Sequence, residues 1–345
     1  MVYIIGEIGQ NHNGSIEIAK ALIDISSTSV LDEFSGEELQ PLNAVKLTKR
    51  DLSEELSASQ MKMPYDNSNS FGKTYGEHRA YLELPDEAHY ELYKYAKEKR
   101  MDFVETFCSK GCLSLLKYFK PDKVKVASRD LTNIPLLETL AETKIPLILS
   151  TGMSGQTELD DALSVITRQH DDIAILHCLS QYPAEYKNIN LNTISFLQEK
   201  YPQYTIGYSD HSIGISIPVA AVAMGAQILE KHITLDRRMR GSDHRGSLGI
   251  DGLSRMVRDI RNVEHALGEK AFFESSVIKS SKVKLERSIA TKRAMNKGAV
   301  IKEDDVHLLS PGDGFKWSEL KKVVGKRLVD DMPANEILYT NHLEL

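Results

Sequence analysis

Short apolar, β-branched runs alternate with longer amphipathic stretches along most of the chain, and this alternation constrains the fold more than any other feature. The runs that predict strands are residues 2–8, 44–47, 102–106, 123–127, 146–150, 173–177, 205–208 and 226–232. Helical patterns separate most of them, for example at 84–99, 136–143, 158–167 and 191–200. Such alternation indicates parallel βα units, and eight of them close a (β/α)8 TIM barrel of about 250 residues. An open doubly wound sheet is the alternative, but no Gly-x-Gly-x-x-Gly turn follows the first run.

The C-terminal part of the 345-residue chain has a different pattern. A polar, lysine-rich stretch (KSSKVK) begins at Lys279, and short β-like pieces punctuated by Lys-Gly and Pro-Gly follow it. We therefore predict a barrel domain at 1–278, a linker at 279–286 and a small β-rich domain at 287–345. The last domain is too small to hold an independent active site easily.

Composition narrows the function class and the compartment. The net charge of −6 argues against nucleic acid as the main partner, which would require a basic face. No apolar run approaches the roughly 20 residues that cross a bilayer, and the N-terminus lacks the pattern of a signal peptide. Cys108, Cys112 and Cys178 lack zinc-finger spacing, so reduced thiols in the cytoplasm are expected.

A long polar segment, residues 49–84, follows the second predicted strand. It contains several tyrosines and glycines and a phenylalanine, Phe71. Barrels place their active sites at the C-terminal ends of their strands, so we expect this segment to act as a lid. A disordered insertion is the alternative.

The predicted strand ends carry polar residues that should converge on one mouth of the barrel. Two inward lysines, Lys46 and Lys125, are unusual there because lysine is rarely buried without a partner. Hydroxyl groups accompany them at the neighbouring strand ends. These residues predict a site for a small polyanion carrying phosphate or carboxylate, although each lysine alone could equally form a surface salt bridge.

Two histidines, His211 and His232, also stand at predicted strand ends. Two imidazoles could hold one divalent metal, but a lone histidine is more often structural, and imidazole does not identify the metal. Asp210 could orient His211, and His12 could simply shape a turn. A zinc hydrolase barrel is disfavoured because the first predicted strand lacks a His-x-His pair.

Six motifs occur in a fixed order along the chain. They are Glu7-Ile8-Gly9-x-Asn11-His12-x-Gly14, Ser150-Thr151-Gly152-Met153, His177-Cys178-x-x-x-Tyr182-Pro183, Gly207-Tyr208-Ser209-Asp210-His211, Glu230-Lys231-His232-Ile233-Thr234 and Gly241-x-Asp243-His244-x-x-Ser247-Leu248. Together they resemble the sialic acid (N-acetylneuraminate) synthase family. The C-terminal Lys297-Gly298-x-x-Ile301-x-x-x-Asp305 resembles that family's antifreeze-like (SAF) domain. The resemblance covers nearly the whole chain.

The resemblance implies a metal-dependent condensation of phosphoenolpyruvate (PEP) with an open-chain hexosamine aldehyde, giving a nine-carbon 3-deoxy-2-keto acid and phosphate. It implies a divalent metal on His211 and His232, with Mn²⁺ expected and Mg²⁺ or Co²⁺ as alternatives. Positions matching the PEP site are Lys46, Thr106, Lys125, Ser128, Ser150, Ser180 and Ser209. Positions matching the catalytic acids are Glu7, Asp243 and Asp130, and those matching the sugar site are Tyr182, Asp130, Thr48 and Ser310. The family also implies a homodimer in which the small domain caps the partner's barrel.

The sequence departs from the N-acetylmannosamine-using pattern on the sugar side. Ser310-Pro311-Gly312 replaces Arg-Pro-Gly, and Ala127-Ser128-Arg129-Asp130 replaces Gly-Ser-Gly-Glu. Ser180 and Thr48 replace an asparagine and a glutamine. We therefore expect an acceptor other than N-acetylmannosamine. The alternatives are a related PEP-dependent synthase acting on a sugar phosphate and a non-catalytic protein that binds through its antifreeze-like domain.

Overall fold

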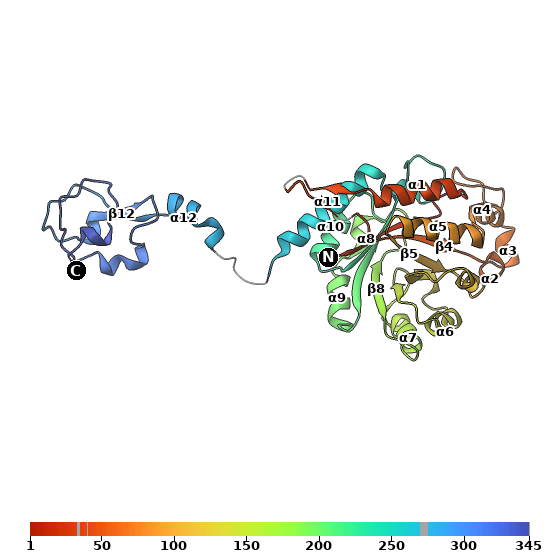
Figure 1. Cartoon of the computed structure of the whole chain (residues 1–345). Coiled ribbons are helices and arrows are strands. Elements are labelled where there is room, and N and C mark those ends of the chain that lie inside the picture. Colours follow the sequence, from red (N-terminus) through yellow and green to blue (C-terminus); the bar gives the residue numbers. More distant parts are fainter. Residues whose placement is uncertain (33–34, 40, 270–274, 345) are drawn as a thin grey trace. The chain divides into compact units, whose positions relative to one another are not determined.

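The computed structural model describes residues 1–32, 35–39, 41–269 and 275–344. Two compact units make up the chain, Met1–Gly268 and Glu269–Leu345 (Figure 1). The first unit ends earlier than residue 278, where the sequence placed the end of the barrel domain. In the described ranges, no helix has both the length and the apolar character needed to span a bilayer.

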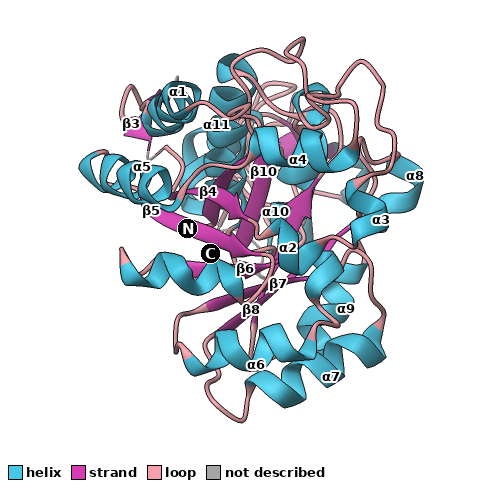
Figure 2. Ribbon diagram, turned by 90° about the vertical axis from the view of Figure 1, so that its right-hand side faces the viewer, coloured by secondary structure: helices cyan, strands magenta, loops and turns pink. Residues whose placement is uncertain are grey.

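The first unit is a closed barrel of eight parallel strands, as the sequence predicted (Figure 2). In chain order the strands are β1 (Tyr3–Gly9), β4 (Ala44–Lys49), β5 (Asp102–Phe107), β6 (Lys123–Val126), β7 (Leu147–Ser150), β8 (Ile173–Cys178), β9 (Thr205–Asp210) and β10 (Ile228–His232). Each strand pairs with its neighbours in sequence order, and β10 pairs with β1 to close the ring. The predicted TIM-barrel fold is confirmed.

Because side chains alternate along the strands, they contribute to two separate apolar clusters, one inside the barrel and one outside it. An apolar cluster fills the barrel below the mouth and consists of Ile5, Ala44, Val104, Ile148, Ala174, Leu176 and Ile228. A larger apolar cluster lies between the strands and the surrounding helices. On β4, Ala44 belongs to the inner cluster and Val45 to the outer one, so Lys46 faces inward again. The period of two therefore places a lysine one layer above an apolar floor.

Helices cover the outside of the barrel (Figure 2). They are α1 (Ile16–Ser27), α5 (Asp86–Glu98), α6 (Ile134–Glu142), α7 (Gln156–Ile166), α8 (Tyr186–Ile189), α9 (Thr193–Lys200), α10 (Ser216–Ala223) and α11 (Ile250–Leu267). The predicted helical patterns correspond to α5, α6, α7 and α9. Between β5 and β6 the connection is the 3₁₀ helix η1 (Gly111–Lys117), and a short hairpin of β2 (Val30–Leu31) and β3 (Glu38–Leu39) follows α1.

Residues 49–84 form α2 (Leu52–Glu55), α3 (Ala58–Met61) and α4 (Tyr75–Leu82). Thr74 and Glu77 form a reciprocal capping box that starts α4. Phe71 stacks on Tyr81, with ring centroids 4.7 Å apart and an interplanar angle of 6°. The segment is therefore a folded layer above the barrel, and the alternative of a disordered insertion is wrong.

The second unit contains the helix α12 (Lys279–Leu285), which occupies most of the predicted linker, and an antiparallel pair of β11 (Ser288–Thr291) and β12 (Val306–Leu309). Its small apolar core is built from Ile289, Met295, Ile301, Val306, Val323, Leu328, Met332, Leu338 and Leu343. Isolated bridges such as Met295–Met332 hold the remaining irregular strands together. This is the β-rich architecture expected for the C-terminal residues.

Candidate active site

A cavity of about 360 Å³ opens at the C-terminal ends of the barrel strands. The predicted residues that line it are Glu7, Lys46, Thr48, Thr106, Lys125, Ser128, Ser150, Ser180, Tyr182, Ser209, His211, His232 and Asp243. They come from all eight strands or from the loops that follow them. The structure therefore brings these residues together around one cavity, as expected for parallel strands that present their C-terminal ends at one face of a barrel.

Glu7 and Lys46 form a buried ion pair at the base of the cavity, with Lys46 Nζ 2.6 Å from Glu7 Oε2. The Lys46 ammonium also donates to Thr106 Oγ1 at 3.0 Å. The register of β1 against β4 shifts between Glu7 and Gly9. Gly9 has a φ of +53°, and an added Cβ would lie 2.9 Å from Glu7 Oε1, so a larger residue there would strain the backbone and displace the Glu7 carboxylate.

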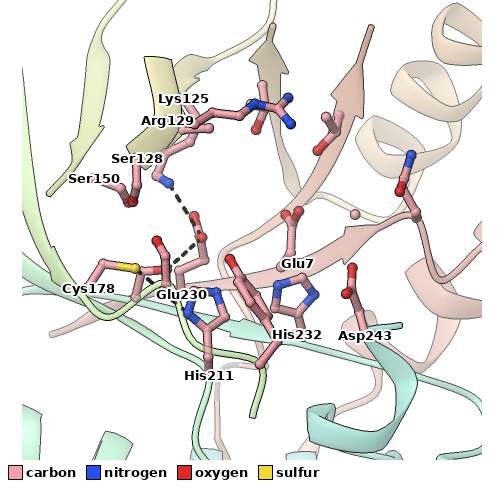
Figure 3. Close-up of a pocket in the computed structure, with 18 of the residues that line it drawn as sticks. Glu7, Lys125, Ser128, Arg129, Ser150, Cys178, His211, Glu230, His232 and Asp243 are labelled. Atoms are coloured by element: carbon pink, nitrogen blue, oxygen red, sulfur yellow. Dashed lines mark hydrogen bonds and ion pairs between the residues drawn. The ribbon is translucent and has the colours of Figure 1, made fainter. Parts of the chain in front are cut away.

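A second buried carboxylate, Glu230, lies between the two lysines. Its oxygens are 3.5 Å from Lys125 Nζ and 3.8 Å from Lys46 Nζ, and Ser209 Oγ donates to Oε1 at 2.9 Å (Figure 3). Glu230 belongs to the Glu230-Lys231-His232-Ile233-Thr234 motif but was not predicted as a site residue. Its spacing of two residues from His232 on β10 was the available signal, because residues i and i+2 share one face of a strand.

The two carboxylates have different proton affinities. Burial raises the pKa of Glu7 to about 7 even though Lys46 is adjacent. Burial also opposes ionisation of Glu230, but Lys125 and Lys46 outweigh it and hold the pKa of Glu230 well below its ordinary value. Paired acids whose environments separate their pKa values are typical of sites that move protons.

His211 and His232 lie side by side near Glu7 and Asp243 (Figure 3), with ring centroids 5.4 Å apart. His211 Nδ1 donates to the Leu179 carbonyl oxygen at 2.9 Å, which leaves Nε2 as a possible ligand atom. His232 Nδ1 is buried without a hydrogen-bond partner among the described residues. An orphaned imidazole nitrogen beside a second imidazole fits a divalent metal. The described residues contain no cluster of three or more His, Cys, Asp or Glu side chains arranged as metal ligands, so substrate or water would complete the shell.

Two neighbouring residues have structural partners instead. The Asp210 carboxylate accepts hydrogen bonds from Tyr208, Ser212 and the buried Lys231, so the suggestion that it orients His211 is wrong. His12 accepts the Gly14 backbone N–H at 3.0 Å, which is the turn-shaping role left open by the sequence.

Two predicted residues are not among those that line this cavity: Asp130, expected as both a catalytic acid and a sugar-site residue, and Ser310, expected at the sugar site. Asp130 is buried and does not line the cavity; its carboxylate accepts from Arg129 Nε at 3.2 Å. Arg129 itself lines the cavity and is also held by Glu55 and by Cys108 Sγ. Ser310 belongs to the second unit, where its hydroxyl donates to the Leu285 carbonyl at 3.1 Å, and its contact with a sugar stays a prediction.

Arginines from the segment 49–84, which were not predicted from the sequence, line the cavity as well. Arg50 follows β4, and Arg79 projects from α4. Arg50 pairs with Glu55 and Glu83. Among the described residues, Arg79 donates hydrogen bonds to two neutral groups, the Tyr75 hydroxyl and the Gln10 side-chain oxygen. The presence of Arg50 and Arg79 at the cavity depends on how the long connection after β4 folds. The periodicity of the sequence does not reveal this.

Comparison with known proteins identifies the family. Residues 40–272 match the NeuB family, and residues 286–344 match the SAF domain. The chain belongs to the NeuB family. It is 33% identical to the N,N'-diacetyllegionaminic acid synthase of Legionella pneumophila, over 99% of this chain and 94% of that protein. It is 32% identical to the human N-acetylneuraminate-9-phosphate synthase, over 99% of this chain and 93% of that one.

Solved structures agree with this assignment. The N-acetylneuraminic acid synthetase of Leptospira borgpetersenii, solved with citrate, has a TM-score of 0.66 and 30% identity, over 81% of this chain and 90% of that one. The Bacillus subtilis spore coat polysaccharide biosynthesis protein spsE has a TM-score of 0.62 and 30% identity, over 100% and 95%. Since the curated relatives are named as acid synthases, this NeuB family chain is an enzyme.

Proposed function

We propose that the enzyme condenses PEP with an open-chain hexose or N-acyl hexosamine aldehyde, giving a nine-carbon 3-deoxy-2-keto acid and phosphate. The observation that carries this proposal is the pair of buried lysines on an apolar floor, with Glu230 between them and Glu7 paired with Lys46. Two cations fixed on strands suit a small molecule with a carboxylate and a phosphate. The serine and threonine hydroxyls around them would donate further hydrogen bonds.

In the proposed reaction, C3 of PEP bonds to the aldehyde carbon, water adds to C2, and the C2–O bond to phosphate breaks. His211 and His232 would hold a divalent metal, which polarises the acceptor aldehyde oxygen when bound. Glu7, with its pKa raised to about 7, can hold or release the proton of the added water near neutral pH. Burial tends to raise the pKa of Asp243, but His232 and the Ser242 hydroxyl keep it below its ordinary value, so Asp243 would accept hydrogen bonds from the acceptor.

The acceptor is proposed to differ from N-acetylmannosamine, for example a diacetamido-dideoxy hexose. This rests on Thr48, Ser180 and Arg129, which line the cavity and depart from the N-acetylmannosamine-using pattern. The similarity to a synthase named for N,N'-diacetyllegionaminic acid is consistent with this idea. Arg129 places a guanidinium where a glycine would leave open space.

An acceptor panel with PEP and Mn²⁺ tests the proposal, with phosphate release and the mass of the keto acid as readouts. We expect release only when PEP and a suitable free sugar are both present. A clear preference for N-acetylmannosamine would refute the acceptor assignment. Absence of phosphate release with every acceptor and metal would refute the condensation itself.

A phosphorylated acceptor is the second candidate. The observation that favours it is Arg79, which lines the cavity and has no carboxylate within ion-pair distance in the described part of the chain. The human relative is named for a 9-phosphate product. Including the 6-phosphate of each sugar in the same panel separates the two candidates by their kcat/KM.

We propose two further properties of the protein as it works. The first is a homodimer in which the small domain caps the partner's barrel, which sedimentation of the full chain at several concentrations would test. The second is a cytoplasmic location, which agrees with three free, buried cysteines, Cys108, Cys112 and Cys178.

A further inference from the structure

Two loops, far apart in sequence, form the outer wall of the cavity. The segment 49–84 contributes Arg79, and the loop between β10 and α11 contributes Ser242 and Asp243. Neither loop is part of the barrel ladder. The distance between their side chains therefore depends on contacts that the loops make with each other and with the barrel.

Phe71 is a fixed platform on the first loop. Its ring stacks on Tyr81 at 4.7 Å and on His78 at 5.9 Å, and its backbone N–H donates to His78 Nδ1 at 3.1 Å. His78 and Tyr81 belong to α4, the helix that also carries Arg79. The orientation of the Phe71 ring is thus coupled to the position of this helix.

Arg240 lies on the second loop and reaches this platform. Its guanidinium carbon is 4.8 Å from the Phe71 ring centroid, which is cation–π geometry. Its carbonyl oxygen accepts from Asn13 Nδ2 at 3.0 Å. The next residue, Gly241, has a φ of +141°, and an added Cβ would lie 2.8 Å from the His244 ring. The chain therefore turns sharply between Arg240 and Asp243.

The residues that follow Asp243 in the chain are held by hydrogen bonds next to the barrel strands. Ser247 Oγ donates to the Asp243 carbonyl at 2.7 Å, and the buried His244 is held between Thr234 and Asn13. The Arg240 side chain links the N-terminal side of this loop to the segment 49–84 through Phe71. Arg238 is a useful contrast, because in the described part of the chain its guanidinium bonds Asp236 of its own loop and no residue of the segment 49–84.

We propose that Arg240 and Phe71 are positioning residues, which hold Asp243 and Arg79 at the separation that the acceptor sugar requires. This inference rests on the proposed function, in which Asp243 faces the acceptor. The PEP side is built on barrel strands and is independent of the contact. Loss of the contact should therefore weaken use of the acceptor and leave PEP binding unchanged.

The test is a set of variants assayed with the best acceptor and PEP. Arg240→Ala and Phe71→Leu should each raise the acceptor KM about two- to fivefold, the range of an exposed cation–π contact, with the PEP KM within about twofold of wild type. Arg240→Lys should keep the acceptor KM close to that of wild type because it keeps a cation over the ring. Arg238→Ala is the matched control and should behave as wild type.

The double variant Arg240→Ala/Phe71→Leu should be no worse than Phe71→Leu alone, because Arg240→Ala removes only the cation–π contact that Phe71→Leu also removes. Additive effects, or equal effects of Arg240→Ala and Arg238→Ala, would overturn the proposal. Hydrogen exchange of residues 237–243 gives a readout independent of catalysis. Faster exchange in Arg240→Ala than in Arg238→Ala supports the coupling even if no acceptor is turned over, and equal exchange overturns it.

Discussion

Replacing Glu230 with glutamine would test the charge balance of the site. The glutamine keeps the size of the side chain and an oxygen for the Ser209 hydroxyl, which donates to Glu230 Oε1 at 2.9 Å. It removes the carboxylate that, in the described residues, lies within 4 Å of both Lys46 and Lys125, at 3.8 Å and 3.5 Å. The change therefore isolates the charge.

The separations give the size of the effect. With an effective dielectric constant near 20, a unit charge pair is worth about 5 kcal/mol at 3.5 Å and about 4 kcal/mol at 3.8 Å. Desolvation of the buried carboxylate cancels part of this, and removing one partner of a buried pair costs about 3–5 kcal/mol in measured cases. We expect Glu230→Gln to lower the free energy of unfolding of the barrel by about 3–5 kcal/mol.

The same change should strengthen anion binding, because phosphate would no longer compete with a carboxylate for the lysines. If phosphate gained a third of the energy of one ion pair, about 1.4 kcal/mol, its Kd would fall about tenfold. The assay is urea unfolding by far-UV circular dichroism at increasing phosphate. The single tryptophan, Trp317, lies in the second unit and would not report on the barrel.

Glu105→Gln is the matched control. Glu105 is also a buried glutamate on a barrel strand, but it bonds His89 at 3.0 Å on the helix side. Its replacement should destabilise the barrel without changing the Kd for phosphate. A Glu230→Gln variant that unfolds within about 0.5 kcal/mol of wild type and binds phosphate no more tightly would refute the reasoning.

Three further changes test other parts of the structure. His211→Ala should lower metal-dependent turnover at least a hundredfold and leave the far-UV spectrum unchanged, and full activity after chelation and gel filtration would contradict the metal assignment. Gly9→Ala should lower kcat at least tenfold, since its Cβ would displace Glu7, whereas Gly36→Ala, with nothing within 4 Å, should affect stability alone. Burial raises the pKa of Glu83 to about 7, so its contribution to stability is complete below the unfolded pKa near 4.5 and is lost as pH rises through 7. From pH 5 to 8 the wild type should lose about 2–3 kcal/mol relative to Glu83→Gln in urea titrations, and a constant difference would contradict the raised pKa.

The strand residues of the site could be predicted because the barrel imposes a simple geometry. Period-two alternation and the shared C-terminal face were enough to bring Lys46, Lys125 and Ser209 together. The loop residues could not be predicted in this way. Arg79 reaches the cavity only because a capped helix forms within a long connection, and Asp130 turns away because Arg129 offers its carboxylate a partner.

This difference has a consequence for specificity. The lysines, Glu7 and Glu230 are held by the hydrogen-bonded ladder of the barrel, so their positions change only if the barrel changes. Arg79, Arg129 and Asp243 lie in connections that follow strands, outside the hydrogen-bonded ladder of the barrel. Substitutions in those loops can alter the acceptor without disturbing the buried charge cluster, whose rearrangement costs several kcal/mol. The anion site should therefore be shared among related enzymes that use different sugars, and exchange of loop residues alone should be able to transfer acceptor preference between them.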